Sequence, residues 1–330
     1  MASHAVVIVL IAFLVPAFAV AWLARSRITQ LAVDKPNARS LHANPVPRTG
    51  GLGLLAGVAA AWAFVAPQLP WPLWAALALV IAVSLADDLR GLPAAVRLAA
   101  HLVAAVLVVY ALLPAGTPVA MLLAAVLAVA WMSNLYNFMD GADGLAGGMT
   151  VSGFAAYAVA AWLAGSTQFA LLNLAVAAAA GGFLLHNFHP ARIFMGDAGA
   201  VTLGFLAAVF GLIGWEQHDW TWWFPPLVFS PFIVDASVTL ARRLLSGARV
   251  WEAHRDHYYQ RLVLLGLGHR CTALAEYALM VSCAAFALWA MTLTSTAHYP
   301  VLGTVALLYV ALIAGVEHAW RSRSRKVSDA

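Results

Sequence analysis

The chain has 330 residues, of which 63% are hydrophobic and only 10% are charged. Its mean hydropathy is +0.85, and a soluble domain carries about 25% charged residues, so the composition excludes an ordinary soluble enzyme and indicates a polytopic membrane protein. The formal net charge is +4 at pH 7, but the basic residues flank apolar stretches, where anionic lipid explains them better than nucleic acid.

Apolar stretches close to the length of a spanning helix, about 20 residues, recur along the chain. They predict an all-α membrane protein with about eleven transmembrane helices, of which the third is the shortest. The predicted spans are 5–24, 49–67, 71–86, 96–113, 117–133, 147–164, 168–186, 198–214, 224–243, 271–293 and 299–319. We expect one integral membrane domain over residues 1–330, with a basic cytoplasmic tail at 321–330.

The basic residues are distributed unevenly between the predicted loops. All 18 lysines and arginines fall in five segments, and the apolar stretches between these segments pair up, so the chain crosses and returns before each new segment. These segments are 25–48, 87–97, 187–197, 242–270 and 321–326. Because Lys and Arg collect in cytoplasmic loops, we expect the N-terminus outside, the C-terminus inside, and an active-site cleft that faces the cytoplasm.

An acidic pair closes the third predicted span. Asp87 and Asp88 repel each other, and ionisable groups beside an apolar helix are costly and functional by default. A single acidic residue here would fit a solvated helix end, balanced in this case by Arg90. The pair favours a functional role instead.

A second polar motif follows the fifth predicted span. Asn134, Asn137, Asp140 and Asp143 recur every third residue, and on an α-helix such side chains share a face with a drift of about 60° per step. Two intervening glycines allow the helix to end there, so we expect the amides and carboxylates to converge in one polar pocket. A glycine-rich turn with Asn and Asp caps is the alternative interpretation.

A third motif, Asn187-Phe-His-Pro-Ala-Arg-Ile-Phe-Met-Gly-Asp, precedes the eighth predicted span. Its last residue, Asp197, fits an ordinary N-cap, and the same position suits a ligand for a metal or a polarised phosphate. Phe194 is a candidate stacking platform for a base, with a core or interface role as the alternative.

Histidine-rich and basic segments complete the charged face. His254 and His257 are spaced to share a helix face, and Arg255 between them adds a donor suited to phosphate oxygens. Zinc is the competing interpretation of paired histidines, but no cysteine joins them and the arginines would repel a cation. The loop before the second span, which holds Lys35 and Arg48, suits an ordered contact with an anion.

Carboxylates crowded together with phosphate-type donors are expected where a divalent cation bridges them to phosphates. Mg²⁺ is the usual ion, because it keeps octahedral oxygen ligation from one or two carboxylates plus substrate phosphates. The five motifs together indicate phosphoryl transfer at a lipid interface.

Two of these motifs are highly specific: Asn-Phe-Met-Asp-Gly-Ala-Asp-Gly-Leu-Ala at 137–146 and Ile-Phe-Met-Gly-Asp-Ala-Gly at 193–199. Through them the chain resembles the polyprenyl-phosphate N-acetylhexosamine-1-phosphate transferases of glycosyltransferase family 4. The resemblance covers roughly residues 30–262 and runs through all five loops in order. It implies transfer of a sugar 1-phosphate from a UDP-sugar to undecaprenyl phosphate in the bacterial inner membrane, with Mg²⁺, or Mn²⁺ as the alternative, and release of UMP.

The resemblance and the residue patterns together give three sets of candidate residues. The candidate catalytic residues are Asp87, Asp88 and Asp140. The candidate metal ligands are Asp197 and Asn137. The candidate substrate-binding residues are Lys35, Arg48, Asn137, Asp143, Asn187, Phe194, His254, Arg255 and His257. Direct attack and a phospho-aspartate intermediate both stay open at this point.

The histidine motif bears on the choice of donor. The peptidoglycan branch of the family carries three successive histidines, whereas this chain has His-Arg-Asp-His at 254–257. We therefore expect GlcNAc or a 6-deoxy relative as the transferred sugar, in the branch that starts O-antigen or teichoic-acid synthesis. A MurNAc-pentapeptide phosphotransferase is the alternative within the family.

The expected partners are the UDP-HexNAc donor, the undecaprenyl phosphate acceptor, the lipid bilayer and a second copy of the chain in a homodimer. Nucleic acid is not expected. A membrane transporter is the alternative from another class, suggested by Asp235 and the prolines of the ninth span. A transporter should carry acidic groups at mid-membrane and on both sides, whereas here they concentrate at one face.

Overall fold

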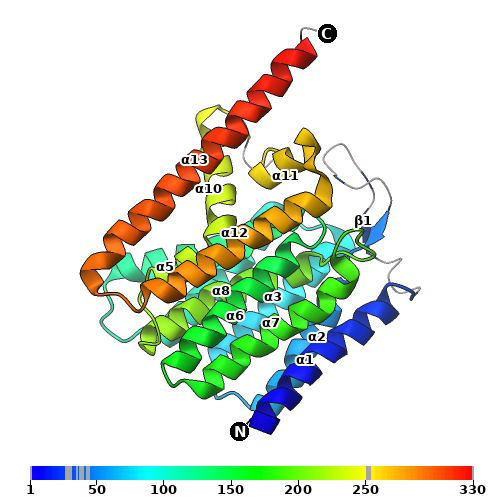
Figure 1. Cartoon of the computed structure of the whole chain (residues 1–330). Coiled ribbons are helices and arrows are strands. Elements are labelled where there is room, and N and C mark those ends of the chain that lie inside the picture. Colours follow the sequence, from blue (N-terminus) through cyan, green and yellow to red (C-terminus); the bar gives the residue numbers. More distant parts are fainter. Residues whose placement is uncertain are drawn as a thin grey trace.

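The computed structural model describes residues 2–26, 32–34, 36, 41, 45–249 and 254–328. It is a bundle of long helices with one two-stranded antiparallel ribbon at one end (Figure 1). The helices are α1 (Ala2–Leu23), α2 (Gly50–Val65), α3 (Trp71–Arg90), α4 (Ala94–Leu112), α5 (Val119–Met139), α6 (Leu145–Leu163), α7 (Thr167–Asn187), α8 (Asp197–Glu216), α9 (Phe224–Val228), α10 (Ser230–Leu245), α11 (Tyr258–Leu262), α12 (Gly268–Ala290) and α13 (Ser295–Ser328). The strands are β1 (Val33–Asp34) and β2 (Val46–Pro47), and a π-helical turn (Val263–Leu267) joins α11 to α12.

The predicted fold class is confirmed. Nine helices within the described ranges are long and apolar enough to cross a membrane, and each predicted span corresponds to a helix or, for the ninth, to the pair α9 and α10. The protein is therefore an all-α, multi-pass membrane protein. α8 and α6 are the most buried of these nine, and α13 is the least. α13 lies along the edge of the bundle, and its C-terminal half extends beyond it (Figure 1).

The third span is longer than the sequence predicts. α3 has 20 residues and continues through Asp87 and Asp88 to Arg90, because hydrogen-bond donors from other elements compensate both carboxylates, as described below. It ends at Gly91, whose φ of 68° is left-handed and suits glycine.

Among the long helices that correspond to predicted spans, the shortest are α2 and α10, with 16 residues each. The ninth span is divided at Phe229 into α9 and α10. Prolines occupy the first turn of both pieces, and a proline has no N–H to donate to the preceding turn.

A close glycine contact brings α2 against α8. A Cβ placed on Gly51 would lie 2.5 Å from the Cα of Gly199, so only glycine fits at this crossing. The first N–H groups of α2 donate to the segment before α8: Gly50 to Phe194 O at 2.9 Å and Gly51 to Met195 O at 2.8 Å. The N-terminus of α2 thus fixes the chain that leads into Asp197.

The ribbon at the same end orients the loop before α2. β1 pairs with β2 in antiparallel register, with Val33 opposite Pro47. The N–H of Phe194 donates to Pro47 O at 2.7 Å. This ribbon therefore places Arg48 directly beside the start of α8.

Candidate active site

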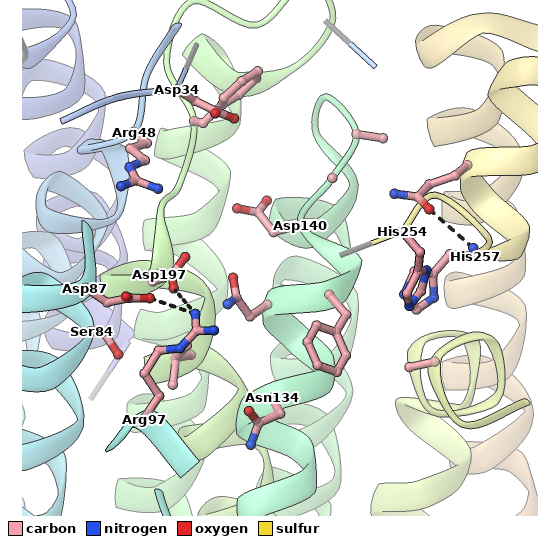
Figure 2. Close-up of a pocket in the computed structure, with 18 of the residues that line it drawn as sticks. Asp34, Arg48, Ser84, Asp87, Arg97, Asn134, Asp140, Asp197, His254 and His257 are labelled. Carbon is pink, nitrogen blue, oxygen red and sulfur yellow. Dashed lines mark hydrogen bonds and ion pairs between the residues drawn. The ribbon is translucent and has the colours of Figure 1, made fainter. Parts of the chain in front are cut away.

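A cavity of about 690 Å³ lies where α3 and α5 end and where α4 and α8 begin (Figure 2). Its lining includes nine of the candidate residues: Arg48, Asp87, Asn137, Asp140, Asp143, Phe194, Asp197, His254 and His257. Apolar side chains from α4, α5 and α10, among them Leu98, Phe138 and Leu240, also line it. The cavity lining thus has a polar part and an apolar part.

Asp88 holds the N-terminus of α8. Its carboxylate accepts the backbone N–H of Asp197 at 3.1 Å and that of Ala198 at 2.9 Å. Arg48 donates to the backbone carbonyl of Asp88 at 2.7 Å, and its Nε lies 3.5 Å from the carboxylate. Asp88 is 4% exposed and is not part of the cavity lining, so the structure gives it a positioning role.

The alternative interpretation of Asp197, as an N-cap, is wrong by one residue. Asp197 is the first residue of α8, and the N-cap residue is Gly196, which has no side chain to cap the helix. Asp88 supplies the missing acceptor from another helix, where two N–H groups at a helix start attract a carboxylate. The side chain of Asp197 is consequently free of capping and faces the cavity (Figure 2).

Arg97 joins two of the cavity carboxylates. Its Nη1 lies 2.7 Å from Asp87 Oδ2 and 3.4 Å from Asp197 Oδ2. The other oxygen of Asp87 accepts the N–H of Leu92 at 2.5 Å. Asp87 is therefore held in place at the cavity wall, between the end of α3 and the start of α4.

Asp140 follows α5 and faces the same cavity from the other side (Figure 2). Burial raises the pKa of Asp140 well above its usual range, and the negative charges of Asp197 and Asp88 raise it further. The predicted end of the helix is confirmed: α5 stops at Met139, and Gly144, with a φ of 76°, precedes α6.

The charges of this corner do not balance. Four carboxylates (Asp87, Asp88, Asp140, Asp197) face two guanidinium groups (Arg48, Arg97). The amide side chains of Asn134 and Asn137 add neutral oxygens to the lining. Full ionisation of the four carboxylates would leave an excess of two negative charges, and this excess together with the all-oxygen ligand set fits a divalent cation of the Mg²⁺ type, whose charge would keep Asp140 ionised.

Asp143 belongs to a separate cluster with two histidines. Its Oδ2 lies 2.6 Å from His189 Nδ1 and accepts the N–H of Ala191 at 3.1 Å. His269 Nδ1 lies 3.5 Å from the other oxygen and accepts the N–H of Asp143 itself at 3.3 Å. The two histidine rings stack with 5.5 Å between centroids.

The distances alone fit two interpretations of this cluster: a metal site, or a set of hydrogen bonds that orient Asp143. Ligand atoms of Asp143, His189 and His269 lie within 4.8 Å of one another, the only such three-residue group among the described residues. However, His269 Nε2 lies 3.2 Å from Leu41 O, which fixes its remaining nitrogen as the acceptor for Asp143. The hydrogen bonds thus account for the arrangement without a metal, and we assign the histidines to the orientation of Asp143.

Asn187 does not reach the cavity, contrary to its predicted substrate contact. Its Oδ1 accepts the N–H of Gly144 at 3.1 Å, and its Nδ2 donates to Ile193 O at 3.0 Å. Both ends of the amide are engaged, and the residue is 2% exposed. Asn187 therefore ties the start of α6 to the loop before α8.

The histidine segment is organised by Asp235 of α10. This carboxylate accepts the N–H groups of Tyr258 and Tyr259, each at 2.9 Å, and lies 3.1 Å from His257 Nδ1. The rings of His254 and His257 lie 5.0 Å apart, and both line the cavity.

The two charged neighbours of these histidines point elsewhere. Asp256 pairs with Arg243, which anchors the segment to α10. The side chain of Arg255 is exposed and does not line the cavity, so its predicted donor contact gains no support from the geometry. Lys35, the remaining candidate, lies outside the described residues.

Residues 70–214 match the model of glycosyl transferase family 4. The chain is 31% identical over 264 residues to a probable undecaprenyl-phosphate N-acetylglucosaminyl 1-phosphate transferase of Bacillus subtilis, with 74% of each chain covered. The chain belongs to glycosyl transferase family 4. This confirms the family that the two specific motifs predict.

Two further relatives in this family differ in how much of the chain they match. A decaprenyl-phosphate N-acetylglucosaminephosphotransferase of Mycolicibacterium smegmatis is 30% identical over 319 residues, covering 81% of this chain and 77% of the relative. A phospho-N-acetylmuramoyl-pentapeptide-transferase of Staphylococcus saprophyticus is 32% identical over only 131 residues, or 40% of each chain.

The match to the family model runs from the residue before α3 to α8. It therefore includes Asp87, Arg97, Asp140 and Asp197, but not Arg48 or the segment of His254. The carboxylate corner of this family 4 protein is built by one continuous stretch, and residues from both flanks complete the cavity.

From the sequence alone, three residues that organise the site are not selected, and a fourth is given no role in it. Arg97 entered only as part of the charge count, and His189 and His269 were not selected although His189 lies inside a recognised motif. Asp235 is the fourth residue: its sequence position suggests either a transporter or a residue near the active face, and no local pattern shows that it binds the histidine segment. The available signal for Arg97 is its position in the first turn of α4, one short loop after Asp87 at the end of α3.

Proposed function

We propose that this protein transfers a HexNAc 1-phosphate, with GlcNAc or a 6-deoxy relative as the sugar, from a UDP-sugar to undecaprenyl phosphate and releases UMP. The observation that carries the proposal is the corner of four carboxylates and two guanidinium groups at one end of a membrane bundle, around a cavity with an apolar side. The name and 74% coverage of the Bacillus subtilis relative support the same reaction.

In the proposed reaction a phosphate oxygen of the acceptor forms a bond to the β-phosphorus of the donor. The bond from that phosphorus to the bridging oxygen breaks, and UMP leaves with this oxygen. A phosphate monoester has a second pKa of about 6, so most of the acceptor is already a dianion at neutral pH. Asp87, the member of the pair that borders the cavity, takes the proton of the remainder. Direct attack is favoured because the oxygens of both aspartates already have partners: those of Asp88 bind the start of α8, and those of Asp87 bind Leu92 N–H and Arg97.

Asp197 and Asn137 would hold Mg²⁺, or Mn²⁺ in its place, with Asp140 facing the same space. When bound, the ion would polarise the donor phosphates and offset the charge that develops on UMP. Asp88 would support this arrangement indirectly, because it binds the backbone N–H of Asp197 and so fixes the position from which that side chain projects.

The donor would extend across the cavity between two groups of residues. His254 and His257 line the side nearest α10 and offer ring nitrogens to the diphosphate. Phe194 and Asp143, which the family resemblance assigns to the uracil, line the same cavity. The histidines around Asp143 hold its carboxylate in one orientation, as recognition of a planar base requires.

The choice of donor sugar rests on the relatives. Those named for N-acetylglucosamine cover 74% and 81% of this chain, whereas the one named for the MurNAc pentapeptide covers 40%. Exposed Arg255 does not contribute to this choice. The product would start the synthesis of a lipid-linked cell-surface glycan of the O-antigen type.

The location proposed for this reaction is the cytoplasmic face of the bacterial inner membrane, where UDP-sugars are available. The one-sided distribution of Lys and Arg supports it. Transport is not favoured: Asp235, its main evidence, binds backbone N–H groups of the histidine segment.

The proposal is tested with detergent-purified protein, Mg²⁺, undecaprenyl phosphate and a panel of UDP-sugars. We expect UMP release and a lipid-linked sugar diphosphate, identified by mass spectrometry, with UDP-GlcNAc or a 6-deoxy relative. Product from UDP-MurNAc-pentapeptide alone would overturn the donor assignment. Absence of UMP with every donor would contradict the reaction itself.

A further inference from the structure

The deepest part of the cavity is polar although it lies within the length of the helices. Ser84 of α3, His101 of α4 and Asn134 of α5 line it, and we call these three residues the polar floor. Ser84 precedes Asp88 by one helical turn and His101 follows Arg97 by one turn, so both lie about 6 Å further into the bundle than those charges.

Two atoms of the polar floor lack hydrogen-bond partners. Ser84 Oγ and His101 Nδ1 are buried and bond to nothing in the described structure, and their residues are 2% and 4% exposed. His101 does interact with the side chain of Asn134. Buried polar groups are nearly always paired in native proteins, so unpaired atoms on two residues that line one cavity point to a ligand that supplies their partners.

The groups around these atoms favour an anion. Both ion pairs of Arg97 use Nη1, which leaves its Nη2 and Nε for a ligand. Figure 2 shows Ser84, Arg97 and Asn134 at the end of the cavity that lies away from Arg48. Asn134 Nδ2 donates to Ala130 O, so its Oδ1 is the acceptor for His101 Nε2–H, and His101 Nδ1 donates only when the ring is an imidazolium, the form that a neighbouring phosphate dianion stabilises. A hydroxyl, an imidazolium Nδ1–H and a guanidinium together suit the several acceptor oxygens of a phosphate monoester.

The apolar lining determines which phosphate can reach this depth. Leu98 of α4, Phe138 of α5 and Leu240 of α10 line the cavity, and Phe138 is 43% exposed. A prenyl chain would lie favourably along these side chains. The nucleotide of a UDP-sugar has no apolar part to place there.

We propose that the polar floor binds the phosphate of the polyprenyl phosphate acceptor, with Ser84 and His101 holding two of its oxygens and Arg97 offsetting its charge. The inference rests on the proposed function and deepens it by naming the acceptor subsite. The remaining phosphate oxygen is then directed toward Asp140 and Asp197, where the donor diphosphate would lie.

The test separates acceptor binding from donor binding. Ser84→Ala and His101→Leu should each raise the KM for polyprenyl phosphate about 10-fold, the effect of losing one charge-assisted hydrogen bond. The KM for UDP-GlcNAc should change less than about 2-fold. His101→Gln keeps a hydrogen-bonding side chain and should restore most of the acceptor affinity, which a purely structural role of the ring would not predict.

Ser133→Ala is the matched control. Ser133 is 1% exposed and its Oγ donates to Val129 O, but it does not line the cavity, so this variant should keep both KM values. Thermal unfolding of each variant checks the fold. For any variant that unfolds early, Ser84→Thr, which keeps the hydroxyl, supplies the comparison.

A binding measurement makes the inference independent of turnover. Native mass spectrometry should show that wild-type protein retains polyprenyl phosphate in preference to the polyprenol of equal length, and that Ser84→Ala with His101→Leu loses this preference. If the wild type keeps the preference but uses no UDP-sugar, the proposed function is wrong and the acceptor subsite stands. If the variants leave the acceptor KM and the preference unchanged, or raise both KM values equally, the floor holds only water and the inference is wrong.

Discussion

Among single residues, Asp197 is the carboxylate whose charge matters most in the proposed chemistry. Asp197→Asn keeps the size of the side chain and leaves the backbone N–H groups to Asp88, so the fold should persist. We expect turnover to be lost at every Mg²⁺ concentration, measured as UMP release. Near-normal turnover would remove Asp197 from the metal site.

His254 makes stability depend on pH. Burial lowers its pKa from 6.5 to about 4, and the neighbouring His257 ring and the positive charge of Arg243 act in the same direction. Between these values the unfolded chain binds a proton that the folded chain does not, so stability falls as the pH falls through this window. The melting temperature should drop between pH 7 and pH 4.5 (roughly the span of these pKa values), and less so in His254→Gln.

The control for this pH effect is His4→Gln, which removes an exposed histidine at the start of α1. It should follow the wild-type pH dependence. Parallel curves for wild type and His254→Gln would show that His254 does not contribute.

The sequence predicts residues that occur in periodic motifs, and it misses their partners from other helices. The convergence of Asn137 and Asp140 at the end of α5 follows from a spacing of three. The pairing of Arg97 with Asp87 and Asp197 depends on how α4 crosses α8, and no local pattern records that. For the same reason Asn187, polar and inside a recognised motif, was interpreted as a substrate contact although it joins two loops.

At the scale of helices, the contact between α2 and α8 controls the position of Asp197. Gly51→Ala would place a Cβ 2.5 Å from Gly199 Cα, so the helices must separate, at a cost of about 1–3 kcal/mol. We expect a lower melting temperature together with reduced turnover, because α8 begins at the site.

Gly303→Ala is the matched control for this helix contact. A Cβ at Gly303 in α13 meets nothing within 4 Å, and alanine in a helix interior is favoured over glycine by about 0.5–1 kcal/mol. This variant should be as stable as the wild type or more so. Equal melting temperatures for Gly51→Ala and Gly303→Ala would contradict the close packing of α2 and α8.

Helix existence follows from hydropathy, whereas helix ends depend on distant partners. The sequence predicts that the span 71–86 ends before Asp87 and Asp88, because charged side chains are costly in a membrane helix. Arg97, Arg48 and the N-terminus of α8 compensate them, so α3 continues for another turn. The break at Phe229 has a local cause, the prolines in the first turns of α9 and α10. The sequence shows these prolines, but hydropathy alone predicts one continuous span there.

At the scale of the whole molecule, the proposed orientation can be tested by cysteine labelling. Gln217 and Ser246 are both exposed and lie just after α8 and α10. With Cys271 and Cys283 replaced, Gln217→Cys should react in intact cells with an impermeant thiol reagent, and Ser246→Cys should react only after lysis. The reverse pattern would place the cavity outside, away from any UDP-sugar.

The two aspartates at the end of α3 differ in what a substitution there would report. Asp87 borders the cavity, whereas Asp88 binds the first N–H groups of α8 and fixes the position of that helix. An inactive Asp88 variant would resemble the loss of a reacting group, yet its defect would be a misaligned helix carrying an intact Asp197. A mutational survey that treats the two aspartates as equivalent would assign a chemical role to Asp88, although its role is structural. A crosslink that held α8 in place would separate the two, since it should rescue Asp88 variants and leave Asp87 variants inactive.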